Sequence, residues 1–248
     1  MAVVAAVATV LLIAFLLWFT FGTQRNISRG NELLQWLQAG LPVLGKRTTV
    51  RWLGSSAVQL AIAQAEPPYA SAQVNVVLEP RDIGLLWAWA RQRGRRDFLI
   101  LRGTLGGPPR FELEAGAREG WTSTERLDRL DPGAWLRTTW PAGDGDGDVS
   151  GHGGGVDVAH STRADRTDLD AARKAWDQLA EATGGRVWRL SVRNLAPNVE
   201  VHLEPPASDG LGTTDAAALT EAFAALGRLA SRDAPPGGSA ATDTGPGR

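Results

Sequence analysis

The longest apolar stretch of the chain lies at its start. The segment from Ala2 to Phe21 contains no charged residue and consists mainly of Ala, Val, Leu and Phe. A helix of about 20 residues covers the ~30 Å hydrocarbon core of a bilayer and satisfies its own backbone hydrogen bonds there. The pattern therefore predicts a transmembrane helix, with the lipid bilayer as the partner of residues 2–21. A core helix of a soluble domain is the alternative.

The residues around this segment indicate a retained anchor. A cleaved secretory signal has a basic start, a shorter apolar stretch and a small-residue cleavage site, which this pattern lacks. Trp18 and Phe21 suit the headgroup boundary, and Arg25 and Arg29 follow directly. By the positive-inside rule, we expect a single-pass protein of the cell membrane, with its N-terminus outside and its C-terminal domain in the cytoplasm.

Two short segments far apart in the sequence resemble each other. Val74–Pro80 and Val199–Pro205 are identical at five of seven positions. Apolar residues alternate with other residues in both, and a proline, which cannot donate to a sheet ladder, ends each one. We interpret both segments as strands related by an internal duplication. Chance similarity in a chain rich in Ala, Leu and Val is the alternative.

Helical and strand patterns surround the two segments in a similar order. Helices are expected over 31–41, 82–96, 168–183 and 215–229, and strands over 48–53, 58–63, 74–80, 97–104, 110–115, 134–140, 186–193 and 199–205. The glycines and prolines of 106–109 predict a hairpin between strands 97–104 and 110–115. We therefore expect an α+β fold with two-layer antiparallel sheets and helices on one face, built as two α-β-β-α halves that resemble a split β-α-β arrangement.

Composition divides the chain into five parts. They are a transmembrane anchor (1–23), a first α+β half (24–140), a Gly/Asp-rich flexible linker (141–165), a second α+β half (166–230) and a disordered tail (231–248). The linker and tail are rich in Gly, Asp, Pro and Ser, and such segments bury too little apolar surface to order themselves.

The expected helix 82–96 carries the best candidate binding surface. This surface consists of Trp87, Arg91, Arg93, Arg95 and Arg96, with Asp82 as the expected N-cap. An aromatic and basic helix end suits anionic lipid headgroups or the stacked bases of single-stranded nucleic acid. Ordinary packing is the alternative, because Trp89 shares a helix face with Leu85 and Leu86 at core spacing. In that arrangement Arg91 covers the ring of Trp87.

Overall composition excludes few function classes. The net charge of −1 gives no field that would attract nucleic acid, and the absence of cysteine excludes disulfides, thiolate metal sites and cysteine nucleophiles. Gly103–Gly107 follows a strand but lacks the Gly-Lys-Ser/Thr ending of a phosphate loop. We expect no cofactor.

Acidic residues in the linker give a weak metal signal. Asp144, Asp146 and Asp148 alternate as in a calcium loop, but Val149 and Gly155 stand where that loop needs a glycine and a bidentate acid. His152 and His160 lie nearby, but no expected element holds them in place. We expect no metal site.

Three functional hypotheses remain. The leading one is a non-enzymatic, membrane-anchored protein whose cytoplasmic α+β domain is an interaction or assembly module for another protein. The second is a module that binds the membrane surface or nucleic acid through the arginine-rich helix end. The third is a hydrolase-like enzyme that uses Glu79 and Glu204 as paired carboxylates, with His202.

Overall fold

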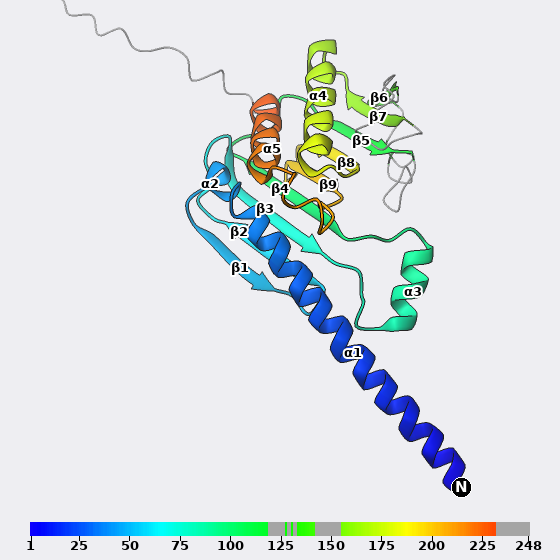
Figure 1. The fold of residues 1–248 in the computed structure, drawn as a ribbon. Coiled ribbons are helices and arrows are strands. Elements are labelled where there is room, and N and C mark those ends of the chain that lie inside the picture. The colour runs from blue at the N-terminus through cyan, green and yellow to red at the C-terminus, as the bar shows by residue number, and fades with distance from the viewer. Residues whose placement is uncertain (119–126, 128–129, 131–132, 142–154, 232–248) are drawn as a thin grey trace, which may run out of the picture.

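The computed structural model describes residues 1–118, 127, 130, 133–141 and 155–231. Within them the protein is α+β, with helices packed on one antiparallel sheet (Figure 1). The helices are α1 (Ala2–Leu37), α2 (Leu41–Leu44), α3 (Gly84–Gln92), α4 (Arg166–Thr183) and α5 (Ala216–Ala230). The strands are β1 (Thr48–Trp52), β2 (Ala57–Ile62), β3 (Tyr69–Val77), β4 (Phe98–Leu105), β5 (Leu113–Ala117), β6 (Trp135–Trp140), β7 (Val156–Ser161), β8 (Val187–Val192) and β9 (Val199–Leu203).

The apolar N-terminal segment is the first part of a longer helix. α1 has 36 residues and continues without a break from Ala2 to Leu37. Residues 2–21 are exposed, whereas Leu33 and Leu37 are fully buried in the core of the domain. Among the described helices, α1 is long and apolar enough to cross a membrane. The apolar segment and the domain therefore share one helix, with no flexible connection between them.

The strands form one sheet of nine, in the order β1-β2-β3-β4-β9-β8-β5-β7-β6. The two similar segments of the sequence lie in β3 and β9, on either side of β4. Leu101 of β4 is opposite Val74 on one side and Val201 on the other. All three side chains are buried, so the alternation correctly identified the core face of these strands.

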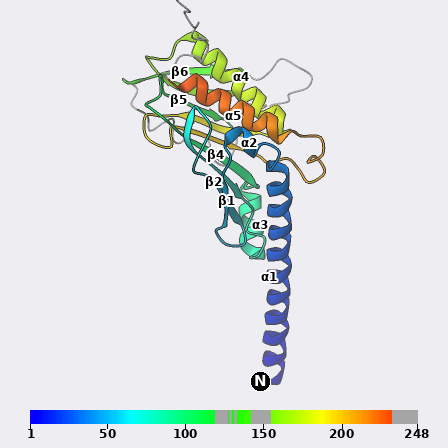
Figure 2. The same cartoon turned by 90° about the vertical axis from the view of Figure 1, so that its left-hand side faces the viewer.

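One face of the sheet is covered by helices. α4 and α5 lie side by side on it, and the end of α1 continues the same layer over β1 to β3 (Figures 1 and 2). Tyr69 joins sheet and helix, because its hydroxyl donates to the Phe223 carbonyl at 2.7 Å and its ring stacks on Phe223. Gly103 and Gly227 leave room for this ring, since a Cβ at either position would collide with it.

The ends of α4 and α5 agree with the expected helices. Asp165 caps α4 in a capping box with Asp168, and Gly184 ends it with a φ of +59°, a conformation that favours glycine. Asp215 caps α5 by accepting from the Ala217 amide at 2.8 Å.

Strand pairing differs from the expected arrangement. β5 lies between β8 and β7, so strands from both expected halves form a single sheet. The expected hairpin of β4 and β5 is wrong, because β4 pairs with β3 and β9. β7 lies inside the expected linker 141–165, where Val156 and Val158 give a short alternating pattern beside the glycines. Hydrophobic alternation identifies a strand but does not choose its neighbour.

The duplication is not confirmed by this topology and stays a prediction. The boundaries of the expected halves also stay predictions. Most of the expected disordered tail, and the acidic residues Asp144, Asp146 and Asp148, lie outside the described residues.

Candidate membrane-proximal and sheet-face sites

The domain end of α1 packs through a narrow stripe of residues. Gly22, Asn26, Gly30, Leu33 and Leu37 are buried, and their spacing of three or four residues places them on one side of the helix. Gly22 lies against the backbone of Arg81, and a Cβ on Gly30 would be 2.6 Å from the Trp52 ring. The two glycines therefore let the helix approach the chain on either side of Asn26.

Asn26 is the polar centre of this stripe. It is fully buried, and its side-chain amide donates to the Glu79 carbonyl at 3.1 Å. Its side-chain oxygen accepts from Arg81 at 3.1 Å. Both ends of the amide are thus satisfied, which a buried polar group requires. The bonds tie α1 to the segment that follows β3.

Asn26 belongs to a larger group that we call the junction network. Its members are Asn26, Arg29, Glu79, Arg81 and Asp97. Arg81 contacts Asp97 at 3.0 Å and Glu79 at 3.6 Å, and Asp97 also accepts from the Glu79 amide at 2.7 Å. The network joins α1 to the end of β3 and to the residue that precedes β4. Arg29, one of the two basic residues that closely follow the apolar segment, is mostly buried in it.

α3 is attached to both the network and α1. The Trp87 indole and the Arg91 guanidinium donate to the carboxylate of Glu79, whose side chain is only 2% exposed. The Trp87 ring also packs against Trp18, with 6.3 Å between the ring centroids, and the Trp18 indole donates to the Arg81 carbonyl at 3.1 Å. Figure 2 shows α3 running beside α1. The first turn of α3 is close to Trp18, because a Cβ on Gly84 would be 2.7 Å from its ring.

The outward face of α3 is apolar and exposed. The exposed fractions are 44% for Ile83, 90% for Leu85, 42% for Leu86 and 52% for Trp89. The interpretation of this face as core packing is therefore wrong. α3 is also shorter than expected, since Asp82 accepts from Ser55 at 2.8 Å and does not cap the helix.

The four arginines of the candidate binding surface differ from one another in their contacts. Arg91 lies over the Trp87 ring at 5.7 Å, as the sequence indicated, and pairs with Glu79. Arg93 lies over the Trp89 ring at 4.1 Å. Arg96 donates to the backbone carbonyls of Arg91 and Arg95, and Arg95 is half-buried. The strongest positive charge accessible to a partner is therefore at Arg93 and Arg96, which are exposed.

A second charged group lies on the face of the sheet opposite α4 and α5, which we call the helix-free face because no described helix covers it. This ion-pair ladder consists of Arg102, Glu200, Arg189, Glu114 and Arg193, on β4, β9, β8 and β5 and directly after β8. Glu200 pairs with Arg102 at 2.7 Å and Arg189 at 3.2 Å. Arg189 continues to Glu114 at 3.0 Å, and Arg193 pairs with the same carboxylate. Sequence reasoning missed the ladder, because its members come from strands whose pairing the pattern does not reveal.

His202 is part of this face and not an isolated surface histidine. Its Nε2 contacts Glu200 at 2.8 Å, and its buried Nδ1 has no hydrogen-bond partner among the described residues. Burial alone would raise the pKa of Glu200, but the hydrogen bonds and charges of His202 and Arg102 outweigh it and lower the pKa to about 2. Glu200 is thus ionised at neutral pH and surrounded by cations.

The proposed pairing of Glu79 with Glu204 finds no support in the contacts. Glu79 is enclosed by Trp87, Arg81 and Arg91, and no hydrogen bond or ion pair between described residues joins it to Glu204. Among the residues that the structure describes, no group of three or more His, Cys, Asp or Glu side chains could hold a metal ion.

Two comparisons with known proteins found no match. No protein-family model matches the chain, and no curated protein is similar to it.

Replacing Asn26 with alanine tests how much the junction network contributes to stability. The change removes the side-chain donor to the buried Glu79 carbonyl and one acceptor of Arg81, which keeps its contacts with Asp97 and Glu79, so we expect a loss of about 1–3 kcal/mol in the free energy of unfolding. Denaturant unfolding of the detergent-solubilised protein measures it. Gln24→Ala, at an exposed position of the same helix, is the control, and equal stability of the two variants would contradict the role of Asn26.

Replacing Glu200 with glutamine tests the ladder through pH. A carboxylate whose pKa falls on folding stabilises the protein above its unfolded pKa of about 4.5, and that contribution disappears as the pH approaches 2. Glu200→Gln should therefore be less stable than wild type near pH 7, and the difference should shrink between pH 4.5 and 2. Chemical unfolding across this range measures the difference. Glu221→Gln, at an exposed position on α5, should show no such narrowing; a constant gap for Glu200→Gln would contradict the account.

Proposed function

We propose that this chain is a single-pass membrane protein whose α+β domain is held in one orientation at the bilayer surface and docks there on another protein. The observation that carries the proposal is the unbroken helix α1. Its first part is apolar and exposed, and its last part is buried in the domain. A single helix that spans the bilayer and also packs in the core of the domain fixes the orientation of the domain relative to the bilayer.

The distribution of basic residues supports a cytoplasmic domain. Arg25 is exposed one turn after the apolar segment, and α3 brings Arg93 and Arg96 to the same end of the domain. The domain side of α1 therefore carries the positive charge that the positive-inside rule assigns to the cytoplasm, with the N-terminus outside.

The helix-free face is the proposed docking surface. In the described part of the chain, α1, α4 and α5 all cover the opposite face (Figures 1 and 2). On the helix-free face, the ion-pair ladder fixes three guanidinium groups and two carboxylates in place. Arg102 (38% exposed) and Arg193 (26%) are its accessible members, and the other three hold them in position. Guanidinium groups held in place in this way recognise an acidic patch on a protein surface, because they lose little side-chain freedom on binding.

The same contacts argue against acid–base catalysis by these groups. Glu200 accepts from Arg102, Arg189 and His202, so its oxygens are already occupied. Neither ring nitrogen of His202 is accessible to a substrate, because Nε2 contacts Glu200 and Nδ1 is buried. A general base needs a free lone pair within hydrogen-bond reach of the proton that it removes.

Photo-crosslinking in native membranes tests the docking surface. A photoreactive amino acid at Gln73, half-exposed on β3 and on the helix-free face, should form an adduct with a membrane or peripheral protein. The same amino acid at Gln178, exposed on α4, should not form that adduct. Adducts of equal yield at both positions, or at neither, would contradict the proposal.

A charge variant relates the adduct to the ladder. Arg102→Gln removes a charge from the docking surface and should lower the yield of the Gln73 adduct about tenfold, the effect of losing roughly 1.4 kcal/mol of binding. Arg166→Gln, an exposed arginine on α4, is the matched control and should leave the yield unchanged.

A further inference from the structure

We infer that α3 is a second membrane-binding element, whose exposed apolar face enters the headgroup region of an anionic leaflet and whose arginines contact lipid phosphates. The inference rests on the proposed anchoring of the protein by α1. It adds a site that α1 alone does not provide, and it names the chemistry of the ligand as the phosphate of an anionic phospholipid.

The position of α3 relative to α1 is the first argument. Trp18 lies near the end of the apolar segment, where a spanning helix meets the headgroups, and it contacts both Trp87 and Gly84. α3 therefore starts at the level where the bilayer boundary is expected. Figure 1 shows that the first turn of α3 lies farther toward the N-terminus of α1 than its last turn does.

The exposed apolar side chains are the second argument. Ile83 and Leu85 lie at the start of α3, with Leu86 and Trp89 following, and all four are exposed. On the neighbouring part of α1, Phe19 and Phe21 are exposed as well, at 43% and 68%. The apolar surface thus continues from α1 onto α3. A bilayer covers both at once, whereas a protein partner on α3 would have to share its site with the lipid around α1.

The charges identify the lipid. Arg93 and Arg96 are exposed at the end of α3 that is farther from the apolar segment, which is the level of phosphates when the first turn is immersed. Arg93 lies on the Trp89 ring, an arrangement that suits a headgroup boundary. Guanidinium groups bind phosphate oxygens in bidentate fashion and favour an anionic leaflet.

The junction network holds α3 in this position. Glu79 accepts from both Trp87 and Arg91, so α3 is fixed to the domain by its inward side while its apolar face stays outward. A helix attached in this way enters the bilayer without refolding. Single-stranded nucleic acid fits less well, because the Trp87 ring that would stack on a base is enclosed by Trp18 and Arg91.

Fluorescent labels on the protein, with α1 retained, test the inference. The natural chain has no cysteine, so a single introduced cysteine gives a unique label. Leu86→Cys reports on α3, Val10→Cys on the middle of the apolar segment and Gln178→Cys on the aqueous side of the domain. Each protein is placed in vesicles of phosphatidylcholine, with or without added phosphatidylglycerol, and iodide on both sides of the membrane quenches exposed labels.

We expect the Leu86 label to be protected from iodide in anionic vesicles, to a degree between those of the other two labels. If the Leu86 label is quenched as strongly as the Gln178 label while the Val10 label is protected, α3 does not bind the bilayer, although α1 still anchors the protein. If the Val10 label is quenched as strongly as the Gln178 label, the anchoring proposal itself fails. If the Leu86 label in detergent responds to a single-stranded oligonucleotide and not to phosphatidylglycerol, the ligand is nucleic acid and the inference is overturned.

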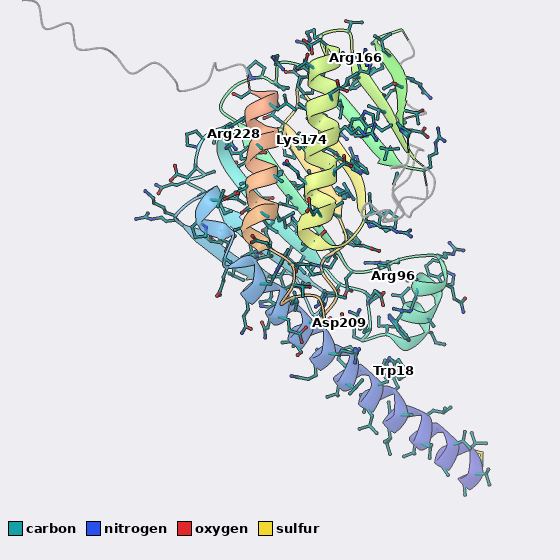
Figure 3. The ribbon with its side chains drawn as sticks, turned by 45° about the horizontal axis from the view of Figure 1, so that its top comes forward. Trp18, Arg96, Arg166, Lys174, Asp209 and Arg228 are labelled. Carbon is teal, nitrogen blue, oxygen red and sulfur yellow. The ribbon has the colours of Figure 1, made fainter. Side chains whose placement is uncertain are left out.

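A charge variant tests the phosphate contact. Arg93→Gln together with Arg96→Gln should lower the ratio of protected to exposed Leu86 label in anionic vesicles by about fivefold for each arginine. Arg166→Gln together with Lys174→Gln removes the same charge from α4, at the end of the molecule far from Trp18 and Arg96 (Figure 3). This control should leave the ratio unchanged, and equal effects of the two double variants would contradict phosphate binding by α3.

Discussion

The structure depends on the packing of α1 against the segment that follows β3. Asn26 is fully buried there and bonded at both ends, and Gly22 and Gly30 bring the helix close enough for those bonds to form. A buried amide without partners would be costly, so the position of the helix is set within narrow limits. The same contacts place Glu79, and Glu79 in turn holds Trp87 and Arg91 of α3. One polar junction thus determines how the apolar segment, the sheet and α3 are arranged.

The two charged groups of the molecule have different consequences. The junction network is largely enclosed and joins elements of the same chain, so its main effect is to make the domain and α1 one body. The ion-pair ladder lies on the helix-free face, where Arg102 remains partly exposed. If the junction fixes the domain at the bilayer, the ladder is presented in one orientation to whatever lies beside the protein in or on the membrane. This combination of a fixed orientation and a rigid polar surface suits a docking module.

Much of the fold could be predicted from the pattern of the sequence. Alternation identified the core faces of β3 and β9, and the expected helix 215–229 closely matches α5, which Asp215 caps. The order of the strands could not be predicted, because every residue of β5 is buried and the pattern does not reveal which neighbours bury it. β7 was hidden by the surrounding glycines. In each case the missing information lies in contacts between distant parts of the chain.

The candidate site was predicted only in part. The sequence indicates Trp87 and the arginines as a binding surface, which stays a prediction, whereas Leu85, Leu86 and Trp89 have the same spacing whether they face a core or a bilayer. The apolar pattern alone therefore could not identify their surroundings. The stripe of Gly22, Asn26 and Gly30 also could not be predicted from apolar periodicity, because it consists of two glycines and a polar residue at a spacing of four. A small-residue stripe next to an apolar segment is a signal of close helix packing.

The most direct test of the account is whether the domain and α1 move as one body in a membrane. Pulsed electron paramagnetic resonance measures the distance between nitroxides on Val10→Cys and Gln178→Cys in vesicles, with a pair on Gln73→Cys and Gln178→Cys as the reference within the domain. The account predicts one narrow distance distribution for the Val10 pair, similar in width to that of the reference. A broad distribution beside a narrow reference would show that the domain swings freely on α1 and would contradict the central claim.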